Sequence, residues 1–317
     1  MSALTRREFL EMAAASGVFL FAALPSNASA KEKVFAARQN KERKEMDLQL
    51  KGKRALVTGS TSGIGESIAK LLAANGAVIT VHGRSEERGK KVVKAITDKS
   101  GKAFLMLGDL RVDEQAARVV NGAVSAMGGV DILVNNAGAY HGIPWLEVTP
   151  EKWADTYNNN VISMVRMVNA LAPEMKKRKW GRIINISSSA GTMAYADGEA
   201  ALDYSACKAA VTNYTAALAR ALAGSGVTVT AVSPGGTRTP GFMRAVAKIE
   251  PDAPDADAKW NAFEKSVFSE AAPKTPVHRF GRPEDIANVV VLLASPLSDW
   301  VSGDNYRVDG GWIPVAF

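Results

Sequence analysis

The stretch RALVTGSTSGIG, residues 54–65, decides the fold of this chain. Its first five residues form an apolar run of strand length, and residues 67–75 (SIAKLLAAN) have a helical pattern that Gly76 ends. Glycines between a strand and a helix let the backbone turn tightly and approach a pyrophosphate, whose charge is stabilised at the helix N-terminus. The stretch therefore predicts a nucleotide-binding strand–turn–helix unit. Because glycine-rich turns are common, this interpretation depends on the rest of the chain.

Further apolar runs follow the first one, mostly separated by longer helical patterns. They lie at residues 77–82, 103–107, 131–135, 182–187, 227–233 and 305–308. They are apolar nearly throughout, which is typical of strands buried on both faces of a parallel sheet. The alternation of strands and helices predicts a doubly wound α/β fold with a parallel, Rossmann-type sheet. No fixed-period repeat and no internal linker after residue 53 indicates a second domain, so we expect a single domain.

The composition is that of an ordinary soluble globular protein, with 47% hydrophobic and 22% charged residues among 317. The formal net charge of +7 favours anionic ligands, but the basic residues are scattered, so we expect no nucleic-acid partner. The single cysteine, Cys207, excludes an intrachain disulfide. His82, His141 and His278 are not at the spacing of metal ligands, and no metal site is expected.

The first thirty residues have the pattern of an export signal. The pair Arg6-Arg7 precedes an apolar run at 12–24 and a small-x-small cleavage pattern at 28–30; the run is shorter than the roughly 20 residues that span a bilayer. The segment resembles a twin-arginine signal, which implies passage of the folded protein through the twin-arginine machinery to the periplasm. Glu11 stands where that pattern often has lysine. A mis-chosen start codon, which would leave a cytoplasmic protein, and an uncleaved anchor are the alternatives.

We therefore expect a signal peptide at 1–30, a charged linker at 31–50 and an oxidoreductase domain at 51–317.

The sequence YSACK, residues 204–208, places Tyr204 and Lys208 on one helix face. A carbonyl that receives a hydride also needs a proton, and a tyrosine with a pKa near 10 is a poor donor at neutral pH. A nearby ammonium stabilises the phenolate and brings that pKa toward the working pH. The pair predicts acid–base chemistry, whereas an exposed helix pair is the alternative interpretation.

Four strand-end motifs identify the family that this chain resembles. TGSTSGIG (58–65), the pair Asp109-Leu110, NNAG (135–138) and PGGTRT (234–239) occur in order after successive strands. Together with residues 281–311 they resemble the short-chain dehydrogenase/reductase family. Within that family the chain looks most like the 3-oxoacyl-[acyl-carrier-protein] reductase group. The resemblance spans about residues 50–312.

The resemblance implies a nicotinamide cofactor bound by residues at these strand ends and by the catalytic helix. They are Thr58, Gly59, Ser60, Thr61, Ser62, Gly63, Ile64, Gly65, Gly83, Arg84, Asp109, Leu110, Asn136, Ala137, Gly138, Tyr204, Lys208, Pro234, Gly235, Thr237 and Thr239. At the end of the second strand an NAD enzyme usually has an acid, whereas this chain has Gly83 followed by Arg84. An arginine pairs well with a 2′-phosphate, so we expect NADP in preference to NAD. A solvated Arg84 is the alternative.

The resemblance also implies a tetrad of Asn160, Ser188, Tyr204 and Lys208. Ser188 would hold the substrate oxygen, and Asn160 would hold a water leading to Lys208. Ser187 competes with Ser188, and the register among the asparagines 158–160 is ambiguous. The implied reaction is pro-S hydride transfer between NADP and a small-molecule carbonyl or the matching alcohol (EC 1.1.1.-), with Tyr204 as general acid/base.

The remaining expectations concern the substrate side and the assembly. Residues 240–276 predict a mobile lid or a pair of helices packed on the body, and residues 192–203 form a long loop. Tyr140, His141, Met193 and Tyr195 are pocket-lining candidates. A homotetramer is expected by analogy. The alternatives to an enzyme of this type are an NADP-binding sensor or scaffold without turnover and a sugar epimerase or dehydratase.

Overall fold

The computed structural model describes residues 46–193, 201–269 and 276–314. The expected signal peptide, most of the expected linker and the pocket candidate Tyr195 lie outside the described residues. From Leu48 on, the chain forms one compact unit. Leu50 is fully buried, and the carbonyl oxygen of Leu48 accepts a hydrogen bond from Ser295 Oγ at 2.8 Å. The segment before the first strand is therefore packed on the body.

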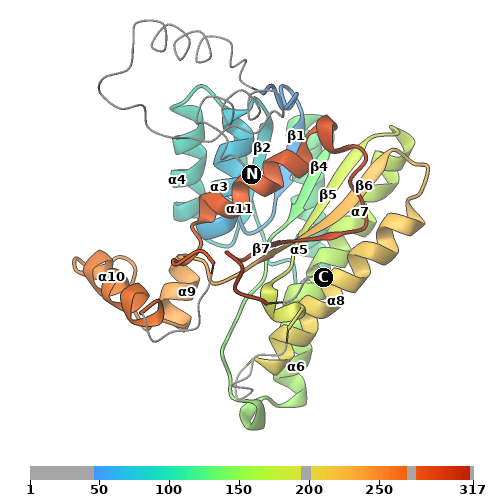
Figure 1. Cartoon of the computed structure of the whole chain (residues 1–317). Coiled ribbons are helices and arrows are strands. Elements are labelled where there is room, and N and C mark those ends of the chain that lie inside the picture. The colour runs from blue at the N-terminus through green and yellow to red at the C-terminus, as the bar shows by residue number, and fades with distance from the viewer. Residues whose placement is uncertain (1–45, 194–200, 270–275, 315–317) are drawn as a thin grey trace, which may run out of the picture. The chain divides into compact units, whose positions relative to one another are not determined.

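A seven-stranded parallel sheet with the order β3-β2-β1-β4-β5-β6-β7 forms the centre of the molecule (Figure 1). The strands are β1 (Arg54–Val57), β2 (Val78–Gly83), β3 (Lys102–Leu107), β4 (Ile132–Asn135), β5 (Gly181–Ile186), β6 (Val227–Pro234) and β7 (Asn305–Val308). The order reverses direction between β1 and β4, as in a doubly wound fold. This confirms the predicted fold class, with strand ends that differ by about one residue from the predicted ones.

The expectation that all strands are buried on both faces is wrong at the two edges of the sheet. Every residue of β5 and β6 is buried, but β3 is exposed at both of its ends and β7 is half-buried throughout. An edge strand has a neighbour on one side only, so apolar side chains there do not imply full burial. Composition alone does not distinguish an apolar edge strand from a central one.

Helices cover both faces of the sheet and divide the core in two (Figure 1). On one face α3 (Gly63–Ala74), α4 (Glu86–Thr97) and α11 (Pro283–Ala294) bury their apolar sides. On the other face α5 (Asp113–Met127), α7 (Ser163–Lys177) and α8 (Leu202–Ala221) do so. In the part of the chain that the structure describes, no helix is both long and apolar enough to traverse a bilayer.

A π-helical turn joins α6 to α7. The helix α6 (Pro150–Tyr157) is capped by Thr149, whose side chain accepts a hydrogen bond from the Lys152 N–H. The π turn, Asn158–Ile162, then leads directly into α7. Such turns are rare and widen the helix locally, which changes the direction in which side chains leave it. All three consecutive asparagines of the sequence lie in this turn.

The segment after β6 has a small core of its own. The helices α9 (Pro240–Ala245) and α10 (Ala256–Val267) pack around Phe280, with Met243 and Trp260 almost completely buried. The Phe280 ring lies 5.2 Å from the Trp260 ring and 5.4 Å from the Phe242 ring, measured between centroids. The described part of the segment thus forms the expected pair of helices, packed around an aromatic cluster of its own, and the mobile lid stays a prediction.

Candidate active site

The predicted cofactor residues lie at the ends of strands or directly after them. Because the strands are parallel, their carboxyl ends share one edge of the sheet, which is where ligands bind in open α/β folds. Tyr204 and Lys208 are in the first two turns of α8, next to the end of β5. Residues that are far apart in the chain thus meet at one edge.

The glycine-rich turn after β1 is closed by its neighbours. Gly59 and Gly63 have φ angles of +62° and +58°, which disfavour residues with a side chain. A Cβ atom on Gly65 would come within 2.4 Å of Asn136 Nδ2 and 2.5 Å of the Gly59 carbonyl oxygen. The bare backbone of this turn is therefore required by the packing around it.

The NNAG turn after β4 holds this loop in place. Asn136 Nδ2 donates to the carbonyl oxygens of Thr58 and Gly59 at 2.9 and 3.0 Å. The backbone N–H groups of Asn136 and Ala137 donate to Thr58 Oγ1 at 2.9 and 3.0 Å. The side chains of Asn136 and Thr58 thus form hydrogen bonds with the protein's own backbone and hold the cofactor loop in place.

His82 also supports the loop, and the sequence analysis missed this role. It is buried, its Nδ1 accepts a hydrogen bond from the Gly59 N–H at 3.1 Å, and its Nε2 lies 3.1 Å from the Gly108 carbonyl oxygen. Burial lowers the pKa of His82 to about 4, so the ring is neutral at physiological pH. A polar residue at the end of a buried strand was the available signal.

The position that often carries an acid in NAD enzymes has no room for a side chain here. A Cβ atom on Gly83 would lie 2.5 Å from the Thr61 methyl carbon and 2.7 Å from its hydroxyl oxygen. Arg84 follows, with its side chain 68% exposed and its Nη1 3.8 Å from Asp109 Oδ2. The structure thus places a glycine, an exposed loop cation and an acid at the predicted adenosine end of the site.

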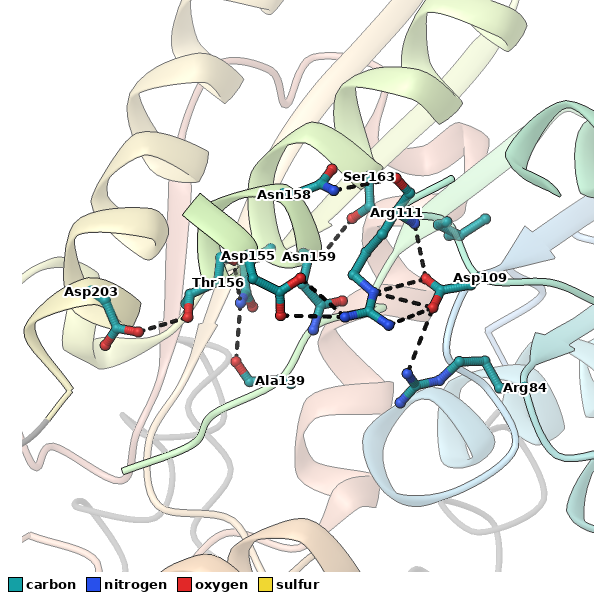
Figure 2. A network of polar contacts seen from close by, with 12 residues as sticks. Arg84, Asp109, Arg111, Ala139, Asp155, Thr156, Asn158, Asn159, Ser163 and Asp203 are labelled. Carbon is teal, nitrogen blue, oxygen red and sulfur yellow. Dashed lines mark hydrogen bonds and ion pairs between the residues drawn. The ribbon is translucent and has the colours of Figure 1, made fainter. Parts of the chain in front are cut away.

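Asp109 is held mainly by Arg111, a residue that the sequence analysis did not single out (Figure 2). Arg111 Nη2 lies 2.7 Å from Asp109 Oδ2, and this hydrogen-bonded partner lowers the pKa of Asp109 to about 2. Asp109 is therefore ionised at any working pH. Leu110, between them, is 5% exposed and belongs to the core.

Tyr204 and Lys208 face each other as their spacing predicted. Lys208 Nζ lies 5.4 Å from the centroid of the Tyr204 ring and donates to the Ile186 carbonyl oxygen at 2.9 Å. Lys208 is 4% exposed, and this burial lowers its pKa to about 8. A buried ammonium beside a phenol is an arrangement that can stabilise a phenolate.

The three consecutive asparagines have different environments. Asn160 Nδ2 donates to the carbonyl oxygens of Ala139 and Thr156, both at 3.0 Å, while its buried Oδ1 has no hydrogen-bond partner among the described residues. Asn158 instead donates to the Arg111 carbonyl oxygen at 3.2 Å, and the Asn159 carbonyl oxygen accepts from Ser163 Oγ (Figure 2). A buried acceptor without a partner suits a bound water, which fits the role expected of Asn160.

The two competing serines also differ in their contacts. Ser187 is buried, and its Oγ donates to the Lys208 carbonyl oxygen at 2.8 Å. Ser188 is half-buried, and its Oγ accepts from the Ala190 N–H at 3.2 Å. Ser187 is therefore part of the packing between β5 and α8, whereas the Ser188 hydroxyl can donate a hydrogen bond to a substrate oxygen.

The loop after β6 completes the edge. The Gly235 N–H donates to the Val308 carbonyl oxygen at 3.0 Å, and Thr237 pairs with Gly281 in an isolated parallel bridge. Thr239 caps α9, and a Cβ atom on Gly63 would lie 3.3 Å from its side chain. This predicted nicotinamide-side loop therefore touches the glycine-rich turn.

Among the pocket candidates, Tyr140 lies beside the predicted acid. Its ring centroid is 5.3 Å from that of Tyr204, and the rings are nearly perpendicular, at 83°. Tyr140 is 38% exposed. His141 directly follows it on the same loop, and Met193 lies at the end of the described stretch after β5. Of the four candidates, Tyr140 is thus the one whose contact with Tyr204 the described residues establish.

A buried polar pair next to Tyr204 was not predicted. Thr156 Oγ1 donates to Asp203 Oδ2 at 2.7 Å, and both residues are 3% exposed (Figure 2). The pair joins α6 to the first turn of α8, which also holds Tyr204. Helix patterns gave no signal for it, because the two residues are 47 positions apart in sequence.

Comparisons with known proteins show the family to which this fold belongs. A model of the short chain dehydrogenase family matches residues 53–250. The 3-oxoacyl-[acyl-carrier-protein] reductase FabG of Aquifex aeolicus (strain VF5) is 35% identical over 267 residues, which cover 84% of this chain and 99% of that protein.

Solved structures with similar folds contain nicotinamide cofactors. L-sorbose reductase from Gluconobacter frateurii, complexed with NADPH and L-sorbose, has a TM-score of 0.77 at 32% identity, over 85% of this chain and 100% of that chain. A 7 alpha-hydroxysteroid dehydrogenase, complexed with NADH and 7-oxo glycochenodeoxycholic acid, has a TM-score of 0.74 at 30% identity, over 84% and 96%.

Proposed function

This chain belongs to the short-chain dehydrogenase/reductase family, and we propose that it is an NADP-dependent carbonyl reductase or alcohol dehydrogenase. Membership makes it an oxidoreductase that uses a nicotinamide cofactor. The observation that supports turnover is the pair of Tyr204 and buried Lys208 at the carboxyl edge of the sheet. A sensor or scaffold without turnover has no need of a buried ammonium beside a phenol.

The residues at this edge fit a dinucleotide. Gly59 and Gly65 have no room for a side chain against the NNAG turn and the loop itself, so the loop stays bare backbone. The first turn of α3, which directly follows this loop, offers backbone N–H groups to a pyrophosphate. Asp109 would contact the adenine, while Thr237 and Thr239 lie where the nicotinamide end is expected. When bound, the nicotinamide would supply or accept the hydride at the carbonyl carbon of the substrate.

The preference for NADP rests on charge and space after β2. Gly83 provides no carboxylate to repel a 2′-phosphate, and the Thr61 side chain fills the volume that an acid would need. Arg84 is exposed on the same loop and can form a charge-assisted contact with that phosphate.

In the proposed mechanism the chain supplies a proton as the carbonyl carbon receives the hydride. Ser188 donates a hydrogen bond to the substrate carbonyl oxygen, and the Tyr204 hydroxyl transfers its proton to that oxygen, which becomes the alcohol. The ammonium of Lys208 stabilises the resulting phenolate. A water that donates a hydrogen bond to Asn160 Oδ1 would then return a proton to Tyr204 by way of Lys208. In the reverse direction, Tyr204 removes the alcohol proton.

The substrate is proposed as a small molecule with a ketone group or the matching secondary alcohol. The groups named for the relatives, a 3-oxoacyl chain, L-sorbose and 7-oxo glycochenodeoxycholic acid, share a carbonyl and little else. A 3-oxoacyl substrate remains the first candidate, because the chain resembles that group of reductases.

Location and assembly are part of the proposal. The leader pattern at 1–30 supports export of the folded protein, and a nucleotide bound before export would have to be reduced and oxidised in place by two substrates. The homotetramer is proposed by analogy, and a hollow of about 550 Å³ bordered by Trp153 and Tyr157 of α6 is a surface that a second copy could contact. Trp153 is 40% exposed, so its ring offers apolar area to a partner.

The first test is a Tyr204→Phe variant assayed for NADPH oxidation, followed at the absorbance of the reduced nicotinamide, with a panel of 3-oxoacyl, sugar and steroid ketones. Losing the acid should lower kcat by about 10²- to 10⁴-fold while NADPH binding changes little. Tyr214→Phe, on the same helix, is the matched control and should retain full activity.

A wild-type chain that binds NADPH but turns over no ketone or alcohol would favour the sensor interpretation. Equal activity in the Tyr204→Phe variant and the wild type would show that another group provides the proton.

A further inference from the structure

We propose that Arg111 sets the preference of this chain for NADP over NAD, because it neutralises Asp109 and so leaves Arg84 available to the 2′-phosphate. This inference rests on the proposed function, since it takes the loop after β2 as the adenosine end of the site. It assigns to Arg111 the part of a specificity-determining positioning residue, one that acts through its neighbours.

Arg111 forms hydrogen bonds with Asp109 through several atoms at once (Figure 2). Its Nε lies 3.1 Å from both carboxylate oxygens, its Nη2 lies 2.7 Å from Oδ2, and its backbone N–H donates to Oδ1 at 3.0 Å. Forked contacts of this kind fix geometry as well as charge. Asp109 therefore has its compensating charge from a residue two positions away on the same loop.

Arg111 is itself anchored on the far side. Its Nη1 lies 3.0 Å from Asp155 Oδ1 of α6, and its carbonyl oxygen accepts from Asn158 Nδ2 at 3.2 Å. The guanidinium thus bridges two carboxylates and is held at both ends. Little side-chain freedom is left for it to lose when a nucleotide binds.

Arg84 is bound much more loosely. Its Nη1 is 3.8 Å from Asp109 Oδ2, and its side chain is 68% exposed, compared with 32% for Arg111. An exposed ion pair at that distance contributes little. Arg84 can therefore leave Asp109 without stranding an uncompensated carboxylate, because Arg111 remains.

Removing Arg111 changes this balance. Asp109 would then draw Arg84 toward itself, and a 2′-phosphate would face both a competing acid and its negative charge. NADH, which lacks that phosphate, would be affected much less. The ratio of the dissociation constants of NADH and NADPH is therefore the quantity that reports the role of Arg111.

The experiment measures Kd for NADPH and for NADH by fluorescence titration of the full-length chain, so no turnover is needed. In the Arg111→Met variant the NADH-to-NADPH Kd ratio should fall about fivefold, because charge contacts between solvent-exposed groups are weak. In the double variant Arg111→Met/Asp109→Asn most of the preference should return, since the competing carboxylate is gone. Arg118→Met, at an exposed position on α5, is the control and should keep the wild-type ratio.

The outcomes separate the two proposals. A wild-type chain that binds both nucleotides equally overturns the NADP assignment and this inference with it. A clear wild-type preference that survives in Arg111→Met, even if both affinities fall, overturns the role of Arg111 alone. If the methionine variant does not fold, two other variants replace it: Arg111→Lys keeps the charge but lacks the fork, and Arg111→Gln removes the charge. A Kd ratio that is unchanged in Arg111→Gln but altered in Arg111→Lys would also contradict the proposal.

Discussion

At the scale of single residues, Lys208 shows how the site is maintained at a cost in stability. It is a buried cation that donates to the Ile186 carbonyl oxygen, next to the ring of Tyr204. Burial of an ammonium disfavours its charged form, which is why its pKa falls from 10.5 to about 8. The burial of Lys208 that is unfavourable for folding also places its ammonium next to the Tyr204 ring, where it can stabilise a phenolate.

This shift predicts a specific dependence of stability on pH. Between pH 8 and 10.5 the unfolded chain holds the Lys208 proton while the folded chain releases it, so the contribution of this group to stability rises as pH rises. A Lys208→Met variant lacks this contribution. The difference in Tm, variant minus wild type, should therefore be largest at about pH 7 and decrease toward about pH 10.

Differential scanning fluorimetry at several pH values measures this difference. Lys99→Met, at an exposed position, is the control and should give a difference that does not vary with pH. A Lys208→Met difference that is equally flat would show that Lys208 is not desolvated in the folded protein.

At the scale of secondary-structure elements, the helices α6 and α8 are joined beside the catalytic tyrosine. The hydroxyl of Thr156 on α6 donates to the buried carboxylate of Asp203, which directly precedes Tyr204 on α8. The Thr156 carbonyl oxygen also accepts from Asn160. One turn of α6 is thus in contact with both of the elements that hold the proposed proton relay.

Breaking this link should destabilise the protein measurably. In a Thr156→Val variant the buried Asp203 loses its hydroxyl donor, and we expect a loss of about 1–3 kcal/mol in the free energy of unfolding. Asp203→Asn should cost less when it is combined with Thr156→Val than in the wild type, because the pair is already broken.

Urea unfolding of the four chains of this double-mutant cycle, at one protein concentration, gives the coupling energy. Single losses that simply add up in the double variant would mean that the hydroxyl and the carboxylate do not interact in solution.

At the scale of the whole molecule, we propose that copies of the chain meet at the surface of α6. Trp145, Leu146 and Trp153 are all at least 40% exposed, and Trp153 borders the hollow together with Tyr157. Exposed apolar side chains that gather on one surface often mark a contact with a partner. In the proposed tetramer, the same surface of a second copy of the chain would cover it.

Native mass spectrometry of the protein from fractionated cells tests assembly, processing and cofactor together. We expect a periplasmic tetramer whose chains begin at Lys31 and carry NADP. Trp153→Asp should dissociate it, because a carboxylate would be buried in the interface, whereas Lys152→Asp on the adjacent exposed position should not. A cytosolic species that begins at Met1 would contradict the export proposal, and a wild-type monomer would contradict the assembly.

The sequence by itself determined the fold and the order of the site. Buried parallel strands have to be apolar, and a cofactor turn needs glycine, so strand runs and strand-end motifs are visible without coordinates. The spacing of Tyr204 and Lys208 likewise predicts their shared helix face, because that face depends only on helical geometry.

Only the tertiary structure decided which polar groups are committed to the protein itself. It placed Ser187 in the packing of α8, gave Asn160 a buried oxygen without a partner among the described residues, and joined Arg111 to Asp109 and Asp155. It also made β3 and β7 the half-exposed edges of the sheet. These features depend on contacts between residues far apart in the chain, and such contacts leave no periodic pattern in the sequence.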